Sequence, residues 1–218
     1  MRNRLVTGGR ANRMSRQTTM PLVVATATAP STVPAVAAAS PGKLWTAIGI
    51  RQHLAVILTL FLLALLTFAN SFSAGFALDN KFLILDDPRV KTVSAENFRL
   101  IFTEDYWFPK AVSGLYRPLT TLTYWFNYAV LGNADQPEMY HALNFLLHWL
   151  NASLVYFVVL ALMGNLWPAF FVAALFTVHP VTTESVTNII GRSDLLSGAC
   201  VLGGLLCYAK AQALAQRP

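Results

Sequence analysis

The sequence predicts an all-α polytopic membrane protein, with about four transmembrane helices and a polar loop that carries short interfacial helices. Composition is the first support: 55% of the 218 residues are apolar and only 12% are charged, about half the charge of a soluble domain. Long charge-free blocks recur along the chain. Charge is also unevenly spread, since all ten acidic residues lie between Asp79 and Asp194, whereas residues 1–53 hold seven basic residues and no acid.

Residues 1–52 are expected to form a disordered basic cytoplasmic tail. Ala, Thr, Ser, Pro and scattered Arg dominate there without hydrophobic periodicity. The basic excess places this tail in the cytoplasm by the positive-inside rule. An organellar transit peptide, which is also rich in Arg and poor in acids, is the alternative. No basic patch is interleaved with aromatic residues, so we expect no nucleic-acid partner.

The membrane module is predicted over residues 53–210, followed by a short cytoplasmic tail over 211–218. Its spans are expected at about 54–72, 140–163, 164–178 and 192–209. The first reads LAVILTLFLLALLTFA and has no charge. The third has only 13 uninterrupted apolar residues, about 20 Å of helix against a hydrocarbon core of ~30 Å. It must therefore be extended, continue past His179 or be re-entrant.

Two spans carry side chains that suggest how helices pack. In the second span four polar residues share one face, and we interpret them as donors of interhelical hydrogen bonds rather than metal ligands; they are His141, Asn144, His148 and Asn151. In the fourth span Ala199, Gly203 and Cys207 recur every four residues, which favours close helix contact. Cys200 and Cys207 are expected to be buried packing residues, too far apart for a disulfide.

The loop over residues 73–139 is expected on the lumenal or extracellular side, because one span separates it from the cytoplasmic basic tail. Ser94 can cap a short helix, and Pro118 can open another in its first turn. The second helix would place its apolar side chains on one face, namely Leu119, Leu122, Trp125, Phe126 and Val130. Such a helix suits the membrane interface. The alternative is a helix of a small soluble loop domain.

Three polar sets are candidates for chemistry on that side. They are Asp86-Asp87, Tyr116-Arg117-Pro118, and the group of His179, Glu184, Arg192 and Asp194. The adjacent carboxylates can hold a general base or simply form a turn before Pro88 that pairs with Arg89. Charges between apolar blocks are functional candidates, although an ion pair of Arg192 with Asp194 or Glu184 would also explain them.

The motifs GLYRPLTTLTYWFNYAVLG, MYHALNFLLHWLNA and LFTVHPVTTESVTNIIGRSDLLSG, after LILDD, resemble one family. The resemblance covers roughly residues 54–208 and is to the N-terminal part of the transmembrane and tetratricopeptide-repeat (TMTC-type) protein O-mannosyltransferases. These are C-type membrane glycosyltransferases. It implies an endoplasmic reticulum enzyme that moves mannose from dolichyl-phosphate mannose to Ser or Thr of secretory-pathway proteins on the lumenal side.

The resemblance also implies roles for residues. The pair Asp86-Asp87 would supply the catalytic carboxylate, and we favour Asp86 because Asp87 precedes Pro88. Arg117 or Arg192 would offset charge on the leaving phosphate, with His179, Glu184 and Asp194 as further substrate-binding candidates. The donor is lipid-linked and already activated, so no metal or other cofactor is expected. The partners would be the bilayer, the lipid-linked sugar donor and the acceptor protein.

Several departures from the family pattern shape the expectations. The family commonly has another His where this chain has Thr182 or Thr183. It also has about ten spans and a helical repeat array, so this chain is expected to be a fragment, a truncated gene model or a degenerate paralogue. A non-catalytic membrane subunit that keeps part of the fold is the runner-up function. A small transporter is disfavoured, because the chain lacks two symmetric halves with broken helices.

Overall fold

The computed structural model describes residues 48–77 and 79–215, and every regular element in these ranges is helical. All of them belong to one compact unit. The predicted basic tail lies outside the described residues except for its last five positions. The elements, in order, are α2 (Ile50–Phe68), η1 (Ala69–Ser73), η2 (Lys81–Leu85), α3 (Pro88–Lys91), α4 (Ala95–Thr103), α5 (Pro118–Trp125), η3 (Phe126–Val130), α6 (Pro137–Met163), α7 (Leu166–Val178), η4 (Pro180–Thr182), α8 (Thr183–Thr187), η5 (Ile189–Gly191) and α9 (Arg192–Ala215).

Three stretches are long and apolar enough to cross a bilayer, namely Ile50–Ser73, Pro137–Met163 and Ile189–Ala215. A fourth candidate is the pair Leu166–Val178 and Pro180–Thr187, bent by 50° at its break. The bend follows from Pro180, which cannot continue the hydrogen bonds of α7. These helices confirm the predicted all-α polytopic membrane fold, and the third predicted span is the bent pair.

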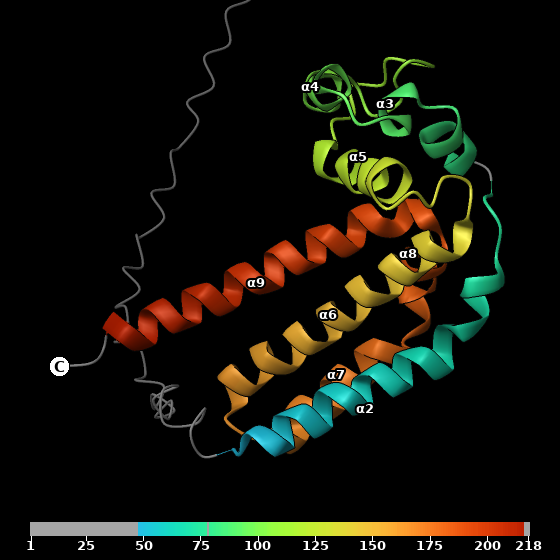
Figure 1. The fold of residues 1–218 in the computed structure, drawn as a ribbon. Coiled ribbons are helices and arrows are strands. Elements are labelled where there is room, and N and C mark those ends of the chain that lie inside the picture. Colours follow the sequence, from blue (N-terminus) through green and yellow to red (C-terminus); the bar gives the residue numbers. More distant parts are fainter. Residues whose placement is uncertain (1–47, 78, 216–218) are drawn as a thin grey trace, which may run out of the picture. The chain divides into compact units, whose positions relative to one another are not determined.

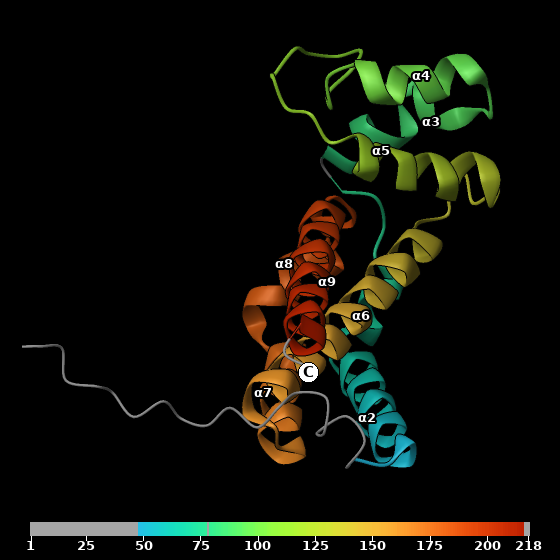
Figure 2. The same cartoon turned by 90° about the vertical axis from the view of Figure 1, so that its left-hand side faces the viewer.

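The long helix α6 is the centre of the bundle. It packs against α2, α7 and α9 (Figures 1 and 2). Gly164 ends α6 with a φ of 65°, a left-handed conformation that glycine adopts without a Cβ penalty. The chain can therefore reverse within two residues into α7. Leu60, Tyr156 and Ala173 are fully buried where α2, α6 and α7 meet.

The polar stripe of α6 ties this helix to its neighbours, as predicted. Each of its four side chains is buried and donates to a backbone carbonyl outside α6. The bonds run from His141 to Ala74 at 3.0 Å, Asn144 to Asn188 at 3.0 Å, His148 to Thr177 at 3.0 Å and Asn151 to Leu195 at 2.8 Å. Interhelical bonds from buried polar side chains are one of the forces that hold membrane helices together, and these four reach η1, the end of α8, the end of α7 and the start of α9. The stripe therefore holds the bundle together at those ends.

The predicted small-residue contact on α9 was wrong for this chain. A Cβ added to Gly203 would meet nothing within 4 Å, and Cys200 and Cys207 are exposed rather than buried. The contact with α6 is made one turn earlier, where a Cβ on Gly198 would lie 3.4 Å from the Asn151 side chain. Only the first part of α9 packs against α6 within the described residues.

The polar segment between α2 and α6 folds into short helices over one end of the bundle (Figures 1 and 2). As predicted, Ser94 caps α4 by accepting the Asn97 N–H, and Pro118 opens α5. The segment has its own core, centred on fully buried Ile84, Val90 and Tyr124. This core also includes Tyr140 and Ile189 from the bundle, so the segment is seated on the ends of the spans.

Helix α5 buries its polar face and exposes its apolar one. Thr120 and Thr121 are at most 4% exposed, whereas Leu119 is 58% exposed and Phe126, the first residue of the continuing helix η3, is 45% exposed. A helix inside a soluble loop domain would do the opposite. The arrangement favours the predicted interfacial helix, whose apolar side lies in the boundary of the bilayer.

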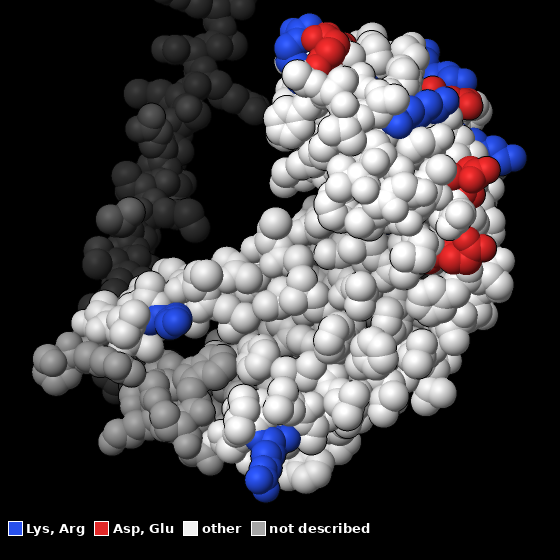
Figure 3. All heavy atoms as spheres, in the orientation of Figure 1, with Lys and Arg blue, Asp and Glu red and all other residues white. Residues whose placement is uncertain are grey.

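Charge separates the two ends of the bundle. In Figure 3 the acidic side chains gather at the end that holds α3, α4 and α5, and the opposite end shows basic side chains only. The sequence assigns the latter to Arg51 at the start of α2 and Lys210 near the end of α9. This polarity is the pattern expected when the basic end faces the cytoplasm.

Candidate functional site

The two adjacent carboxylates lie in different environments. Asp87 is 1% exposed and caps α3 by accepting the Arg89 N–H at 2.9 Å. Its carboxylate also accepts from the Arg89 guanidinium, with a shortest contact of 2.8 Å. Asp86 is exposed at the end of η2. Because Asp87 is engaged with α3 and Arg89, only Asp86 of this pair presents its carboxylate to solvent.

Arg89 links this acidic pair to a distant turn. It is 1% exposed, and its guanidinium also donates to the carbonyls of Asp105 at 3.0 Å and Tyr106 at 3.1 Å. The Phe108 ring lies 5.1 Å from the guanidinium carbon. A planar guanidinium can make several such bonds at fixed angles. Arg89 therefore fixes residues 105–108 relative to Asp87.

The same turn delivers a cation to Asp86. Lys110 Nζ lies 3.0 Å from Asp86 Oδ2, and both side chains are close to half exposed. The ammonium also lies 4.7 Å from the centre of the Phe82 ring. Sequence patterns did not single out Lys110, which is 24 residues from Asp86 and outside any recognisable motif. An exposed carboxylate and an exposed ammonium thus stand together on the polar segment.

Arg117 joins the polar segment to α9. Its guanidinium donates to Ser193 Oγ at 3.2 Å and lies 5.3 Å from the centre of the Tyr106 ring. It is partly exposed, so it remains open to an anionic ligand. Burial raises the pKa of Tyr106 and of Tyr124. Both phenols stay neutral at physiological pH and are not bases: Tyr124 donates to the Ile189 carbonyl, and the Tyr106 ring faces Arg117.

Arg192 is completely buried and has no acidic partner among the residues that the structure describes. Its guanidinium donates to four neutral oxygens, which are Asn144 Oδ1 at 2.8 Å, Asn127 Oδ1 at 2.8 Å, the Tyr140 carbonyl at 3.0 Å and Thr123 Oγ1 at 3.3 Å. The Tyr124 ring lies 4.9 Å from its central carbon. Neither of the ion pairs considered from the sequence forms. Arg192 instead binds α5, η3 and α6 to the first residue of α9.

The other members of the third set are at the surface. His179 caps η4, and its Nδ1 accepts the Val181 N–H at 3.2 Å. Asp194 accepts weak bonds from Ser193 and Ser185 at 3.4 and 3.5 Å. Glu184 is exposed on α8 and forms no ion pair within residues 48–77 and 79–215. The third set is therefore one buried arginine with surface groups around it.

Local backbone geometry makes the inward position of Arg192 possible. A Cβ on Gly191 would lie 2.5 Å from the Ser185 backbone, a distance that real side chains do not reach. Only glycine lets η5 approach α8 this closely. The next residue then begins α9 and directs its side chain under α5.

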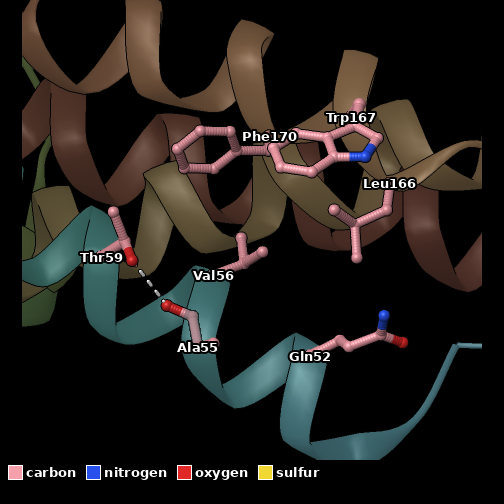
Figure 4. A pocket seen from close by; sticks show the side chains of 7 residues that line it. All are labelled: Gln52, Ala55, Val56, Thr59, Leu166, Trp167 and Phe170. Carbon is pink, nitrogen blue, oxygen red and sulfur yellow. Dashed lines mark hydrogen bonds between the residues drawn. The ribbon is translucent and has the colours of Figure 1, made fainter.

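A pocket elsewhere on the bundle lacks the groups for chemistry. Figure 4 shows its lining from the starts of α2 and α7, the ends remote from the polar segment, and its volume is about 270 Å³. The lining residues are Gln52, Ala55, Val56, Thr59, Leu166, Trp167 and Phe170. None of them titrates, and the Thr59 hydroxyl donates to the Ala55 carbonyl at 2.8 Å. No group of three His, Cys, Asp or Glu in the described ranges could hold a metal ion.

Comparison with known proteins decides the family. Protein O-mannosyl-transferase Tmtc2 of Drosophila melanogaster is 32% identical over 150 residues, 67% of this chain and 16% of the relative. Protein O-mannosyl-transferase tmtc2 of Xenopus laevis is 36% identical over 152 residues, 68% and 18% of the two chains. Over the matched region, the chain belongs to the TMTC-type protein O-mannosyltransferases.

The match covers only part of these TMTC-type relatives. Protein O-mannosyl-transferase F38B6.6 of Caenorhabditis elegans is 30% identical over 171 residues, which are 74% of this chain and 24% of the relative. The chain thus spans less than a quarter of the length of the relatives named here. No family model matches the chain, and no solved structure matches it.

The two motifs that carry the TMTC-type resemblance meet in space. YRPLTTLTY opens α5, and HPVTTESVTNIIGRSDLL forms η4, α8, η5 and the start of α9. Arg117 donates to Ser193, the Tyr124 hydroxyl donates to the Ile189 carbonyl at 3.3 Å, and Arg192 donates to α5 in return. These contacts span 65 to 76 residues of sequence. They join the polar segment to the membrane helices at the acidic end.

Proposed function

We propose that this chain carries part of a protein O-mannosyltransferase that works at the lumenal face of the endoplasmic reticulum membrane. The donor would be dolichyl-phosphate mannose, and the acceptor a Ser or Thr hydroxyl of a secretory-pathway protein. The main support is the exposed Asp86 carboxylate, seated on a segment that α5 holds against the ends of the spans. A lipid-anchored donor presents its sugar at this level, close to the bilayer surface.

In the proposed reaction Asp86 is the general base. It takes the proton of the acceptor hydroxyl while the hydroxyl oxygen bonds to the anomeric carbon of mannose. The bond between that carbon and the phosphate oxygen breaks, and dolichyl phosphate leaves with the electron pair. Asp87 has a supporting role, because its carboxylate is buried against Arg89. Asp86 has helical backbone angles at the end of η2, whereas Asp87 is extended and begins α3, so the two neighbouring carboxylates can take different roles.

The leaving phosphate gains charge and needs a cation more than a proton. Arg117 is the better candidate of the two arginines, because it is partly exposed and its bond to the Ser193 hydroxyl uses only one of its five N–H donors. Arg192 is buried among neutral oxygens, so we assign it a positioning role. His179, Glu184 and Asp194 flank the start of α9 and are proposed to contact substrate. The phosphate is already a good leaving group, so no metal or cofactor enters the proposal.

The proposed orientation follows from charge. The tail and the ends bearing Arg51 and Lys210 would face the cytoplasm, and the acid-rich end would face the lumen. A repeat array for acceptor binding, as the family resemblance implies, would have to lie beyond the residues printed here.

The direct test compares Asp86→Asn with Asp87→Asn in the full gene product, expressed in microsomes. Mannosyl transfer from dolichyl-phosphate mannose to a peptide acceptor is measured per folded molecule. We expect Asp86→Asn to lower the rate by about 10²–10⁴-fold. Asp87→Asn should chiefly lower thermal stability, because it leaves the buried Arg89 without its counter-charge.

Two results would count against this assignment. If both variants fold and transfer mannose at the parent rate, neither carboxylate is the base. If the parent itself transfers no mannose although it inserts and folds, the chain is a non-catalytic member of the family that serves as a membrane subunit.

A further inference from the structure

We infer that Lys110 is a second contact, beside Arg117, for the phosphate of a lipid-linked donor, and that it holds Asp86 when no donor is bound. This inference rests on the proposed function and adds a residue that the sequence motifs do not contain. The structure shows the resting pair, with Lys110 Nζ 3.0 Å from Asp86 Oδ2. Donor binding would draw the ammonium to the phosphate and leave Asp86 free to accept a proton.

Spare hydrogen-bonding capacity distinguishes Lys110 from the arginine beside it. Arg89 uses its Nε and both terminal nitrogens on Asp87 and on two backbone carbonyls. An ammonium has three donors, and Asp86 is the one hydrogen-bond acceptor that Lys110 Nζ has among the described residues. Two donors therefore remain for a phosphate oxygen.

The ammonium is also placed where a ligand can reach it. The Lys110 side chain is 45% exposed, and the Phe82 ring beneath it is 43% exposed. An aromatic face favours a cation above it without occupying its hydrogen bonds. The ring thus supports the ammonium from one side and leaves the other side open.

The position of Lys110 is fixed by the buried acidic residue. Asp87 binds Arg89, and Arg89 holds the carbonyls of Asp105 and Tyr106. The turn that follows Tyr106 is closed by the backbone N–H of Lys110, which donates to the Trp107 carbonyl at 2.8 Å. The two carboxylates therefore have separate roles: Asp86 contacts Lys110 directly, and Asp87 positions the turn that carries Lys110 through Arg89.

A mobile cation suits the charge change of the reaction. A phosphodiester donor carries one negative charge, and the released lipid monophosphate carries up to two. Lysine is a compact charge on a flexible stem, so it can follow the phosphate without a fixed fork geometry. Because the pair is half exposed and screened by solvent, breaking it to engage a phosphate costs little.

Binding and turnover are measured separately on the full gene product in nanodiscs. The probe is a polyprenyl phosphate, with the neutral polyprenol and inorganic phosphate as comparison ligands. We expect Lys110→Gln to weaken polyprenyl phosphate binding about tenfold and to raise the KM for the donor more than it lowers kcat. Lys110→Arg should restore most of the binding. The matched control is Arg99→Gln, which breaks an exposed ion pair with Glu96 in the same segment and should change neither.

Each outcome bears on Lys110 independently of the transferase proposal. Unchanged polyprenyl phosphate binding in Lys110→Gln would overturn the inference, even if the parent transfers mannose. Equal binding of polyprenol, or full competition by inorganic phosphate at the same concentration, would overturn the lipid-linked phosphate as the ligand. If the variant loses binding while the parent transfers no mannose, the phosphate contact is supported and the proposed function fails.

Discussion

The separation of Asp86 from Asp87 is the residue-scale feature on which the site depends. The sequence predicted it in part, since Asp87 before Pro88 was expected to form the turn, and in the structure it caps α3. The partners of Arg192 could not be predicted, because they lie 48 to 69 residues away on three elements. Lys110 was missed for the same reason: only the fold brings it to Asp86.

A conservative change at Arg192 tests its positioning role. Lysine cannot reproduce bonds from three nitrogens to Asn144, Asn127 and the Tyr140 carbonyl, so Arg192→Lys should lower the free energy of unfolding by about 2–4 kcal/mol. Thermal unfolding in detergent measures this, with Arg99→Lys as an exposed control. Mannosyl transfer should fall in proportion to the folded fraction. A normal melting point with lost transfer would instead place Arg192 at the donor phosphate.

The turn that carries Lys110 should open at acidic pH, because Asp105 holds it closed only while its carboxyl group is ionised. The Trp107 N–H donates to the Asp105 carboxylate, with further bonds from Ser113, and this lowers the carboxyl pKa below its usual value. Because the pKa of Asp105 is lower in the folded than in the unfolded protein, its ionised carboxylate stabilises the fold at pH values above the ordinary aspartate pKa. This stabilisation is lost as the pH falls through the folded-state pKa. A nitroxide at Val112, which is 95% exposed, should become more mobile at that acidic pH.

The matched change for this prediction is Asp105→Asn, which should leave the nitroxide mobile at neutral pH and remove the acid transition. A transition of unchanged amplitude in Asp105→Asn would assign the opening to another carboxylate.

At the scale of elements, α5 shows what a hydrophobic pattern can and cannot settle. The pattern predicted the helix and its apolar face correctly, but it left open whether that face is buried in a domain or turned to lipid. The buried polar face favours the lipid-facing alternative, because Arg192 donates to Thr123 and Asn127, and Tyr124 donates to Ile189. The small-residue stripe of α9 failed as a predictor, since spacing does not say which helix will lie opposite.

The interfacial position of α5 can be measured by nitroxide depth in nanodiscs. Labels at Leu119 and Phe126 should collide with lipid-soluble oxygen several times more often than with a water-soluble nickel reagent, because apolar helix faces partition into the interface. A label at Val112 should show the reverse. Equal exposure of all three labels to the nickel reagent would mean that α5 stands clear of the bilayer.

For the whole molecule, the unequal distribution of charge is the property that sequence predicted best. Acids confined to residues 79–194 and a basic start predicted two opposite ends, and the described helices show them (Figure 3). The number of spans was harder to predict, because α7 is too short to cross the bilayer by itself. It becomes a fourth candidate span only together with Pro180–Thr187, from which it is separated by a bend of 50°.

The most direct test determines which side of the membrane the acid-rich end of the bundle faces. The proposed base Asp86, the phosphate contacts Arg117 and Lys110, and the donor must all share one compartment. The measurement uses sealed microsomes and the full gene product with Cys200 and Cys207 replaced by alanine. A cysteine at Ala111 should react with an impermeant maleimide only after the membrane is opened, whereas one at Gln52 should react before. Labelling of Ala111→Cys in intact microsomes would place the acidic end in the cytoplasm and contradict the proposed lumenal mannosyl transfer.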